Sequence, residues 1–412
     1  MERVVITGMG VVSPLGNTVD QFWRRLVQGE SGISSIDTFD TTGYKTKIAG
    51  LIRDFDADTL FGRKEARRMD RFTQFALSAA EQALDDSGIK LDLVDRERVG
   101  VYVGSGIGGI QTLLDQAAVL RERGSERVSP LLVPMMIGNM AAAMISIKYG
   151  ALGPTLAPVT ACSIGNTAIG EAWRLIRSGG ADVIFAGGTE AAITEISIAS
   201  FGNATAMSTR NDQPTRASRP FDTGRDGFVM SEGAGIIMME SLSHAQKRNA
   251  RIYAEVIGYG ASSDAYHIVA THPEGIGAYQ AMKLALLEAN IRPSDVDVIS
   301  AHATSTGIGD ISETMAIKKL FQDDAYRIPV TANKSMIGHM LGAAGAVEAI
   351  ALVKSLRDGI IPPTINQEQS DPVCDLDYVP NIAREADLNI GISSSFGFGG
   401  HNAVIVLRKF ME

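Results

Sequence analysis

Short apolar runs alternate along the chain with longer segments in which apolar residues recur every three or four positions. Over the first 250 residues this pattern predicts strands at 3–7, 99–103, 155–160 and 183–187, and helices at 71–86, 109–121 and 164–178. Strands that alternate with helices are typical of α/β proteins with buried sheets. We therefore expect an α/β fold.

The same alternation starts again after about residue 250. It predicts strands at 251–260, 296–300, 329–332, 390–394 and 403–408, and helices at 275–290, 311–321 and 341–357. We expect two halves, residues 1–250 and residues 251–412. No low-complexity linker separates them, so the halves are expected to pack as one body.

A faint internal similarity connects the two halves. The strand-turn-helix segment 155–178 resembles segment 329–357, with residues 168–172 matching residues 345–349. A duplicated α/β unit explains this similarity, and chance resemblance between two such segments explains it as well.

Composition excludes several classes of protein. The chain has 412 residues, 45% of them hydrophobic, with a net charge of −9 and a pI near 5.3, which argues against a nucleic-acid-binding role for the whole chain. Two distant cysteines, Cys162 and Cys374, make neither a disulfide framework nor a metal cluster and suit a reducing compartment. The N-terminal residues show no leader pattern, and no apolar run reaches the ~18 residues that span a bilayer. We expect a cytoplasmic protein.

Cys162 is placed where a nucleophile would be expected. Small residues surround it between a predicted strand and a long predicted helix. A helix start offers free N–H groups and the positive end of the helix dipole, which favour a thiolate. The alternative is an inert cysteine in the core, which is a common use of this residue.

A glycine-rich segment, residues 104–109, fits the dinucleotide-binding pattern G-x-G-x-x-G. The acidic residue that should end a second strand is missing from the following ~20 residues. We therefore interpret these glycines as a tight turn.

Two of the six histidines, His302 and His339, follow predicted strands in the way that Cys162 does. Open α/β sheets bind ligands at such carboxyl ends of strands. Asp310 is expected to cap a helix, with Glu313 completing a capping box. Metal binding is disfavoured because no carboxylate or thiol stands at ligand spacing to either histidine.

A cysteine, two histidines and the nearby Lys334 suit carbon–carbon bond formation at a thioester. Neutral imidazoles can donate N–H groups to an enolate oxygen, each such donor being worth on the order of 3 kcal/mol. Lys334 could hold the charge of this network and orient a histidine. A Cys-His hydrolase remains an alternative, although it normally needs one histidine oriented by Asn or Asp.

Two further segments have both a functional and a structural interpretation. Glycines flank Phe398 in residues 397–400, which predicts either a movable gate or a tight hairpin with a packed aromatic ring. Residues 63–68 carry four positive charges against one negative charge. Such a run is usually a solvated helix face, and the alternative is a surface that steers an acidic partner.

Together these segments resemble the β-ketoacyl-acyl-carrier-protein synthases, specifically the elongating condensing enzymes of type II fatty acid synthesis. The resemblance covers essentially the whole chain. It rests on the motifs at residues 160–162, 301–306, 334–339 and 397–400.

The resemblance implies a thiolase-like fold of two similar halves in five αβαβα layers, a homodimer, and acyl carrier protein as partner. Cys162 would accept the acyl chain, with the N–H groups of Cys162 and Phe398 as oxyanion hole. His302 and His339 would promote decarboxylation of the malonyl group, and Lys334 would support His339. Relatives often hold a structural monovalent cation, for which the sequence indicates no site; no other cofactor is expected.

The resemblance also implies roles for residues outside the chemical step. Ile107 and Phe201 would line the acyl pocket, Thr304 and Thr306 would contact the pantetheine arm, and Gly399 would lie against substrate. The carrier would dock on Lys64, Arg67 and Arg68.

Several positions depart from the family pattern. Ser163 and Ile164 replace small or hydroxylic residues, Ala303 and Gly307 stand where Gly and Pro are usual, and Thr205 replaces an arginine that faces the carrier in many relatives. Chain-length preference and docking strength are the properties that these departures affect.

Three alternatives stay open at this point. A thiolase would share the fold and use a second cysteine as base, but Cys374 lies outside any matching motif. A polyketide ketosynthase would share every catalytic residue. A non-catalytic chain-length partner would be expected to lack Cys162.

Overall fold

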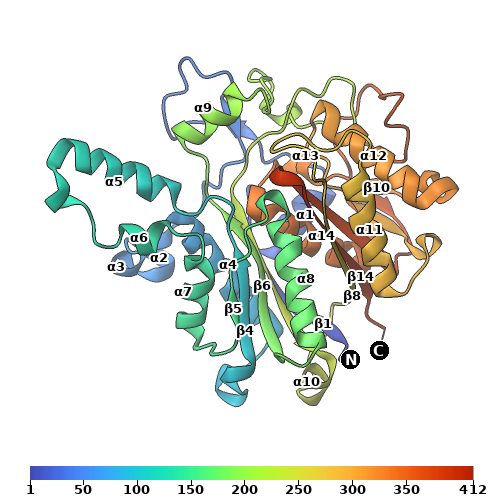
Figure 1. Ribbon diagram of the computed structural model, residues 1–412, viewed down its shortest axis with the longest axis horizontal. Coiled ribbons are helices and arrows are strands. Elements are labelled where there is room, and N and C mark those ends of the chain that lie inside the picture. Colours follow the sequence, from blue (N-terminus) through green and yellow to red (C-terminus); the bar gives the residue numbers. More distant parts are fainter. Residues whose placement is uncertain (412) are drawn as a thin grey trace.

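A ten-stranded sheet is the central element of the computed structural model, which describes residues 1–411 (Figure 1). The N-terminal half contributes β1 (Val4–Val12), β4 (Val99–Gly104), β5 (Thr155–Leu156), β6 (Val183–Glu190) and β7 (Gly233–Ser241). The C-terminal half contributes β8 (Ala254–Ser263), β9 (Val298–Ser300), β10 (Val330–Thr331), β13 (Ile390–Gly397) and β14 (His401–Lys409).

The two halves of the sheet have the same topology. Their strand orders are β5-β4-β6-β7-β1 and β10-β9-β13-β14-β8, so strands that match in chain order also match in position. The halves join where β1 pairs antiparallel with β8 over Val4–Ile6. This repeated order favours duplication over chance resemblance.

The repeat is offset from the alignment suggested by the sequence. A 3-10 turn at Ala161–Ser163 precedes α8 (Ile164–Arg177), and the matching turn at Leu341–Ala343 precedes α14 (Ala344–Asp358). Ala161 and Leu341 share a left-handed backbone, with φ of 50° and 46°. Cys162 therefore corresponds to Gly342, and the predicted match of residues 168–172 with 345–349 is wrong by three residues.

Helices cover both faces of each half-sheet. The central helices α8 and α14 pack between the half-sheets in one large apolar cluster. Outside lie α4 (Arg71–Ser87) and α7 (Met140–Tyr149) on one side, and α11 (Ile276–Ala289) and α12 (Gly307–Phe321) on the other. Figure 1 shows the resulting five layers from left to right, from α7 to α11. The predicted thiolase-like αβαβα fold is confirmed.

The starts of the two central helices lie in close contact because a glycine stands at the crossing. A Cβ atom on Gly165 would lie 2.2 Å from the backbone nitrogen of Ala346. This close approach brings the turn that carries Cys162 beside the turn that follows His339.

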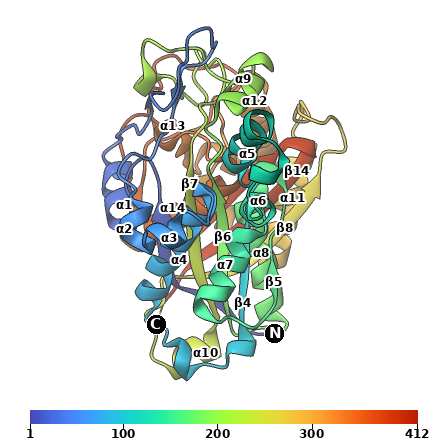
Figure 2. The same cartoon turned by 90° about the vertical axis from the view of Figure 1, so that its left-hand side faces the viewer.

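The remaining helices are shorter or peripheral: α1 (Val19–Val27), α2 (Ala57–Phe61), α3 (Arg63–Ala66), α5 (Ile110–Arg123), α6 (Leu132–Met136), α9 (Glu195–Asn203), α10 (Leu242–Lys247) and α13 (Lys334–Ile337). Figure 2 shows α10 and both termini at one end of the molecule and α9 at the other. In the described residues, no helix combines the length and apolarity needed to cross a membrane.

One predicted strand is too long, and one strand was not predicted. The predicted strand 155–160 is only Thr155–Leu156, and Pro158 lies in the irregular segment that follows. Strand β7 was missed because all nine of its residues are buried, so its sequence lacks the alternation of a half-exposed strand.

Candidate active site

Cys162 lies in the 3-10 turn at the start of α8 and is 7% exposed. Burial raises the pKa of its thiol to about 11, which outweighs the positive charge of Lys334 and the backbone N–H groups of Phe398 and Cys162 itself that point at the sulfur. The backbone N–H groups at the helix start favour the thiolate, as predicted, but removing the thiolate from water costs more free energy than these groups supply, so the net pKa of the thiol is raised.

His302 and His339 line the same cavity as Cys162, with ring centroids 5.4 Å apart and planes at 87°. His302 is the second residue after the end of β9. His339 follows the short helix α13 instead of a strand. The backbone N–H of His339 donates to the carbonyl oxygen of Val229 at 2.7 Å. The two elements approach each other because β9 and β10 are adjacent parallel strands.

Two buried carboxylates hold the loop after His302. Glu313 accepts the N–H groups of His302 and Ala303 at 2.8 and 2.7 Å, and Asp310 accepts the N–H of Ser305 at 3.1 Å. Burial raises the pKa of Asp310 to about 6 and that of Glu313 to about 7. The predicted capping pair is wrong, because α12 begins three residues before Asp310 and both carboxylates face the loop.

Lys334 and Glu348 form an ion pair of 2.6 Å, and each side chain is 1% exposed. Burial and the charge of Lys334 hold the pKa of both His302 and His339 well below the usual range. Both imidazoles are therefore neutral at neutral pH and carry one N–H each. Lys334 does not line the cavity and acts on the histidines through its charge.

The glycine-rich segment after β13 lies against the nucleophile. A Cβ on Gly397 would lie 2.7 Å from Thr160 O and 2.9 Å from the nitrogen of Cys162. This contact holds the backbone N–H of Phe398 near enough to the sulfur to lower the pKa of the thiol. The ring of Phe398 is 37% exposed and lies 6.1 Å from the ring of Phe201.

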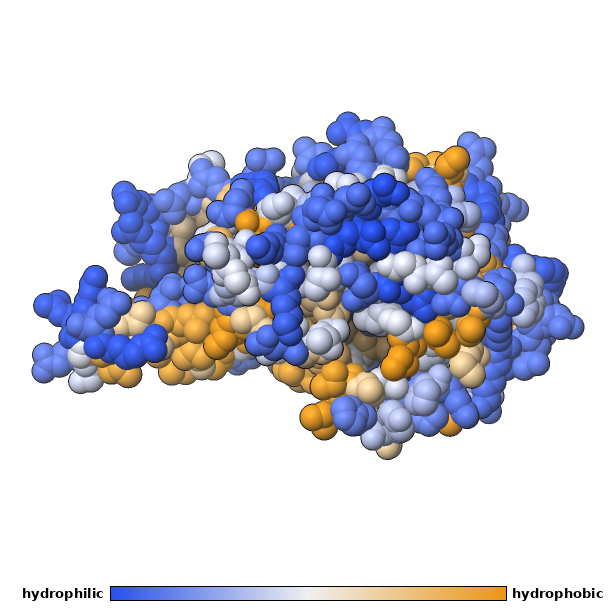
Figure 3. Space-filling view, turned by 90° about the horizontal axis from the view of Figure 1, so that it is seen from above, coloured by the Kyte–Doolittle hydropathy of each residue, from blue (hydrophilic) through white to orange (hydrophobic). Residues whose placement is uncertain are grey.

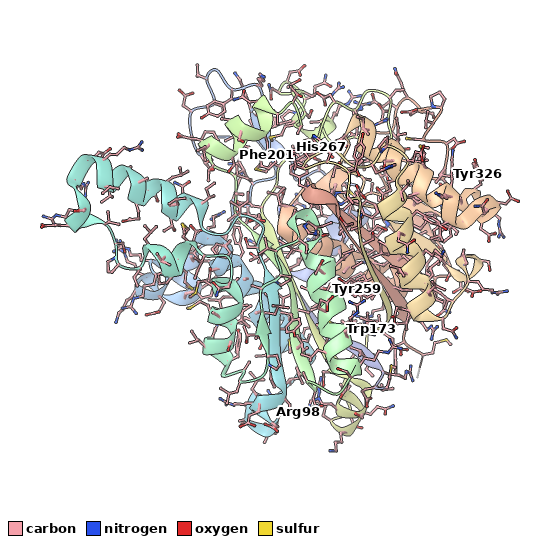
Figure 4. All side chains as sticks on the ribbon, in the orientation of Figure 1. Arg98, Trp173, Phe201, Tyr259, His267 and Tyr326 are labelled. Carbon is pink, nitrogen blue, oxygen red and sulfur yellow. The ribbon has the colours of Figure 1, made fainter. Side chains whose placement is uncertain are left out.

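A cavity of about 510 Å³ unites most of the predicted site. Its lining includes Cys162, His302, His339, Phe398, Ile107, Phe201, Thr304 and Thr306. Figure 3 shows the hollow on the face seen from above, with apolar residues at its rim. Figure 4 places Phe201 and His267 at the same end of the molecule.

Other predicted residues lie outside the cavity wall. Gly399 is not part of the lining, and its N–H donates to Ile268 O at 2.9 Å. The exposed side chains of Lys64, Arg67 and Arg68 lie on and just after α3, also away from the lining. Figure 1 shows α3 on the side of α5 and α6.

Sequence reasoning missed three residues of this region. Phe228 lines the cavity and stacks edge-on against His339 at 5.5 Å. Arg225, whose side chain is 4% exposed, donates to the carbonyl oxygens of Thr306 and Gly307, at 3.0 Å each. Glu348 was noted only as one of residues 345–349 in the internal similarity between the two halves. None of these residues belongs to a local motif.

Comparison with known proteins identifies the family. The N-terminal domain of β-ketoacyl synthase matches residues 1–245, and the C-terminal domain of the same family matches residues 253–368. The chain belongs to the β-ketoacyl synthase family. The predicted resemblance and the predicted class of enzyme, an acyl-transferring condensing enzyme, are thereby confirmed.

Curated relatives match over nearly their whole length. The chain is 47% identical to 3-oxoacyl-[acyl-carrier-protein] synthase 2 of Synechocystis, covering 99% of this chain and 98% of the relative. It is 49% identical to the proteins of the same name from Staphylococcus aureus, with 99% of both chains covered, and Coxiella burnetii, with 100% and 99% covered.

Solved structures agree on the fold. A type II polyketide ketosynthase in complex with its acyl carrier protein superposes with a TM-score of 0.93 at 35% identity, covering 99% of this chain and 100% of the other. A β-ketoacyl synthase from Burkholderia phymatum gives a TM-score of 0.92 at 33% identity, covering both chains fully.

Proposed function

We propose that the protein is an elongating β-ketoacyl-acyl-carrier-protein synthase of fatty acid synthesis. It condenses an acyl group carried on Cys162 with malonyl-acyl-carrier-protein, giving β-ketoacyl-acyl-carrier-protein and CO2. The observation that carries this proposal is the sharing of one cavity by a thiol and two neutral imidazoles. The names of the curated relatives support it.

The first step transfers the acyl group to Cys162. The sulfur attacks the thioester carbonyl, the carbon–sulfur bond to the carrier breaks, and the thiol proton leaves with the carrier sulfur. The N–H groups of Cys162 and Phe398, which point at the sulfur, stabilise the oxyanion. Because the thiol has a raised pKa, its proton must leave during the transfer, and the departing carrier sulfur takes it up.

The second step forms the carbon–carbon bond. His302 and His339 donate N–H groups to the thioester oxygen of the malonyl unit, whose carboxylate leaves as CO2. The electron pair left behind forms an enolate, which attacks the acyl carbon. The carbon–sulfur bond to Cys162 breaks, and the thiolate that leaves takes up a proton from water to restore the thiol. Neutral donors suit this step because an imidazolium would protonate the enolate. Burial keeps both imidazoles neutral, and the charge of Lys334, a positioning residue, adds to this effect.

Acyl carrier protein is the proposed partner, as the Synechocystis relative's name and the solved ketosynthase complex suggest. The hydroxyls of Thr304 and Thr306, 3.1 Å apart at the cavity, would contact its pantetheine arm. Lys64, Arg67 and Arg68 would dock the acidic carrier on a chain whose net charge is −9.

We propose a cytoplasmic homodimer. Apolar side chains remain exposed along α5, α6, α7 and β5, namely Leu113, Leu120, Val133, Ile147 and Leu156. Strand β5 is also an edge of the sheet, with both residues exposed. An exposed edge beside apolar helices is covered most simply by a second copy of the chain.

We propose that a structural monovalent cation is held by a second group of buried atoms. Among residues 1–411, no hydrogen-bond partner is found for the following buried oxygens: Asn166 Oδ1, Ser300 Oγ, Glu348 Oε2, Ser393 Oγ and Ser395 Oγ. Ser300 pairs with Ser393 across adjacent strands. Neutral oxygens with one carboxylate suit a hard cation of low charge, which would supply structural support. The proposal predicts that potassium or sodium raises the melting temperature relative to choline, and that Glu348→Gln removes this difference.

The alternatives differ in how the structure supports them. A polyketide ketosynthase keeps support from the solved complex, but the identity to it is 35% against 47–49% for the curated synthases. A thiolase is disfavoured because Cys374 packs in the outer apolar cluster, away from the cavity lining.

Intact-mass measurement tests the proposed function. Acyl-carrier thioester should add one acyl group to the wild-type protein and none to Cys162→Ala. Addition of malonyl-carrier should then release an extended β-ketoacyl product. Cys374→Ala, which removes the other thiol, is the matched control and should behave as wild type. Acylation without extension would contradict the proposal.

A further inference from the structure

Glu190, the last residue of β6, is a fully buried carboxylate surrounded by hydrogen-bond donors. It accepts the hydroxyl of Ser105 at 2.9 Å and the N–H groups of Gly106, Ile107 and Gly342 at 2.9, 3.1 and 3.1 Å. Four donors converge on two carboxylate oxygens, which is the full accepting capacity of such a group.

These donors come from two walls of the cavity that are distant in the chain and touch each other, since a Cβ on Gly342 would lie 2.9 Å from the nitrogen of Gly106. Gly106 and Ile107 line it on the side of the turn before α5, and Leu341, beside Gly342, lines it next to Cys162. Within the described residues, the side chain of Glu190 is the hydrogen-bonding group that joins these two walls.

The internal repeat explains why a carboxylate stands here. Glu190 ends β6 as Gly397 ends the matching strand β13, and Gly342 corresponds to Cys162. In one half, the strand end and the turn leave N–H groups directed at the nucleophile. In the other half, the carboxylate of Glu190 occupies the place that corresponds to the nucleophile. The N–H groups around it donate to this carboxylate and serve as structural contacts.

We propose that Glu190 is a positioning residue that sets the acyl selectivity of the cavity by fixing the backbone of Ile107 relative to the Leu341–Gly342 turn. This inference rests on the proposed function. With the turn fixed, the side chain of Ile107, which is 36% exposed at the cavity, resists displacement by a long acyl chain. When the turn is loosened, a long acyl chain can displace the side chain of Ile107.

Glu190→Gln tests this role with little change in shape. The amide nitrogen would replace one of the two accepting oxygens. The two donors that bind this oxygen would then face another donor, so two of the four hydrogen bonds are lost. Wild type and variant are given an equimolar mixture of hexanoyl- and dodecanoyl-carrier, and intact mass follows both adducts on Cys162. The ratio of dodecanoyl to hexanoyl rate is expected to rise by about fivefold or more. This ratio does not depend on the fraction of protein that is folded.

Glu240→Gln is the matched control. Glu240 is another fully buried carboxylate with several donors, at the far end of a strand and outside the cavity lining. Its substitution should lower stability and leave the ratio unchanged. If Glu190→Gln does not fold, Ser105→Ala removes one of the four donors and should shift the ratio in the same direction by about twofold.

The outcomes separate the two proposals. A wild-type protein that takes no acyl group would contradict the proposed function. Acylation with the same ratio in wild type and in the folded variant would overturn the role of Glu190 and leave the proposed function intact. An equal change of ratio in Glu240→Gln would also overturn it.

Discussion

The imidazole rings of His302 and His339 lie 5.4 Å apart and nearly perpendicular, although 37 positions separate the two residues in the chain. Neither ring has a hydrogen-bond partner for its buried Nδ1 atom in the described residues. The protonation state of both rings therefore depends on packing and on the charge of Lys334.

Each histidine should be needed for decarboxylation and dispensable for acylation. His302→Asn and His339→Asn are each expected to lower malonyl decarboxylation by about 10²–10³-fold, the usual cost of losing one preorganised donor. Acyl transfer to Cys162, followed by intact mass, should stay within about tenfold of wild type. Equal loss of both steps would show that the histidines do not act on the malonyl unit.

Removal of Lys334 should move the pH profile. The charge of Lys334 lowers the pKa of both histidines, so Lys334→Met should raise those pKa values. Loss of decarboxylation on acidification should then begin at higher pH than in wild type. The rate of CO2 release between pH 5 and 8 measures this shift, and an unchanged acid limb would contradict it.

The same substitution should destabilise the fold, because it leaves Glu348 buried without a counter-charge. We expect a loss of about 3–5 kcal/mol in the free energy of unfolding. The double variant Lys334→Met, Glu348→Gln should recover part of this loss, as urea titration would show. No recovery would mean that the ion pair is not the source of the effect.

Reactivity of Cys162 toward iodoacetamide should increase steeply with pH. Because burial raises the pKa of the thiol to about 11, the thiolate fraction should rise about tenfold per pH unit between pH 7 and 9. The alkylation rate of the Cys374→Ala variant measures this. A plateau reached below pH 8 would show that the helix start outweighs burial after all.

A methyl group at position 397 should separate the nucleophile from its oxyanion hole. Gly397→Ala places a Cβ within 2.9 Å of two backbone atoms, so the segment must move away from Cys162. Acylation should fall by at least about 10²-fold. Gly202→Ala, where the nearest atom to a Cβ is 4.0 Å away, is the control and should keep its rate. Equal acylation rates would exclude a role for the Phe398 N–H.

The sequence by itself determined the α/β class, the division into two similar halves and the residues able to carry the chemistry. Cys162, His302 and the glycines around Phe398 were found because each belongs to a motif a few residues long. Such motifs express local backbone requirements, which neighbouring residues settle without distant contacts.

Only the tertiary structure decided what surrounds these residues. The start of α12 before Asp310, the carboxylate of Glu313 on the histidine loop, the buried Lys334–Glu348 pair and the raised pKa of Cys162 all depend on burial and on partners distant in the chain. Desolvation is set by the packing of whole layers, so no local pattern records it. The motifs name the reacting groups, and the fold sets their charges and brings them together.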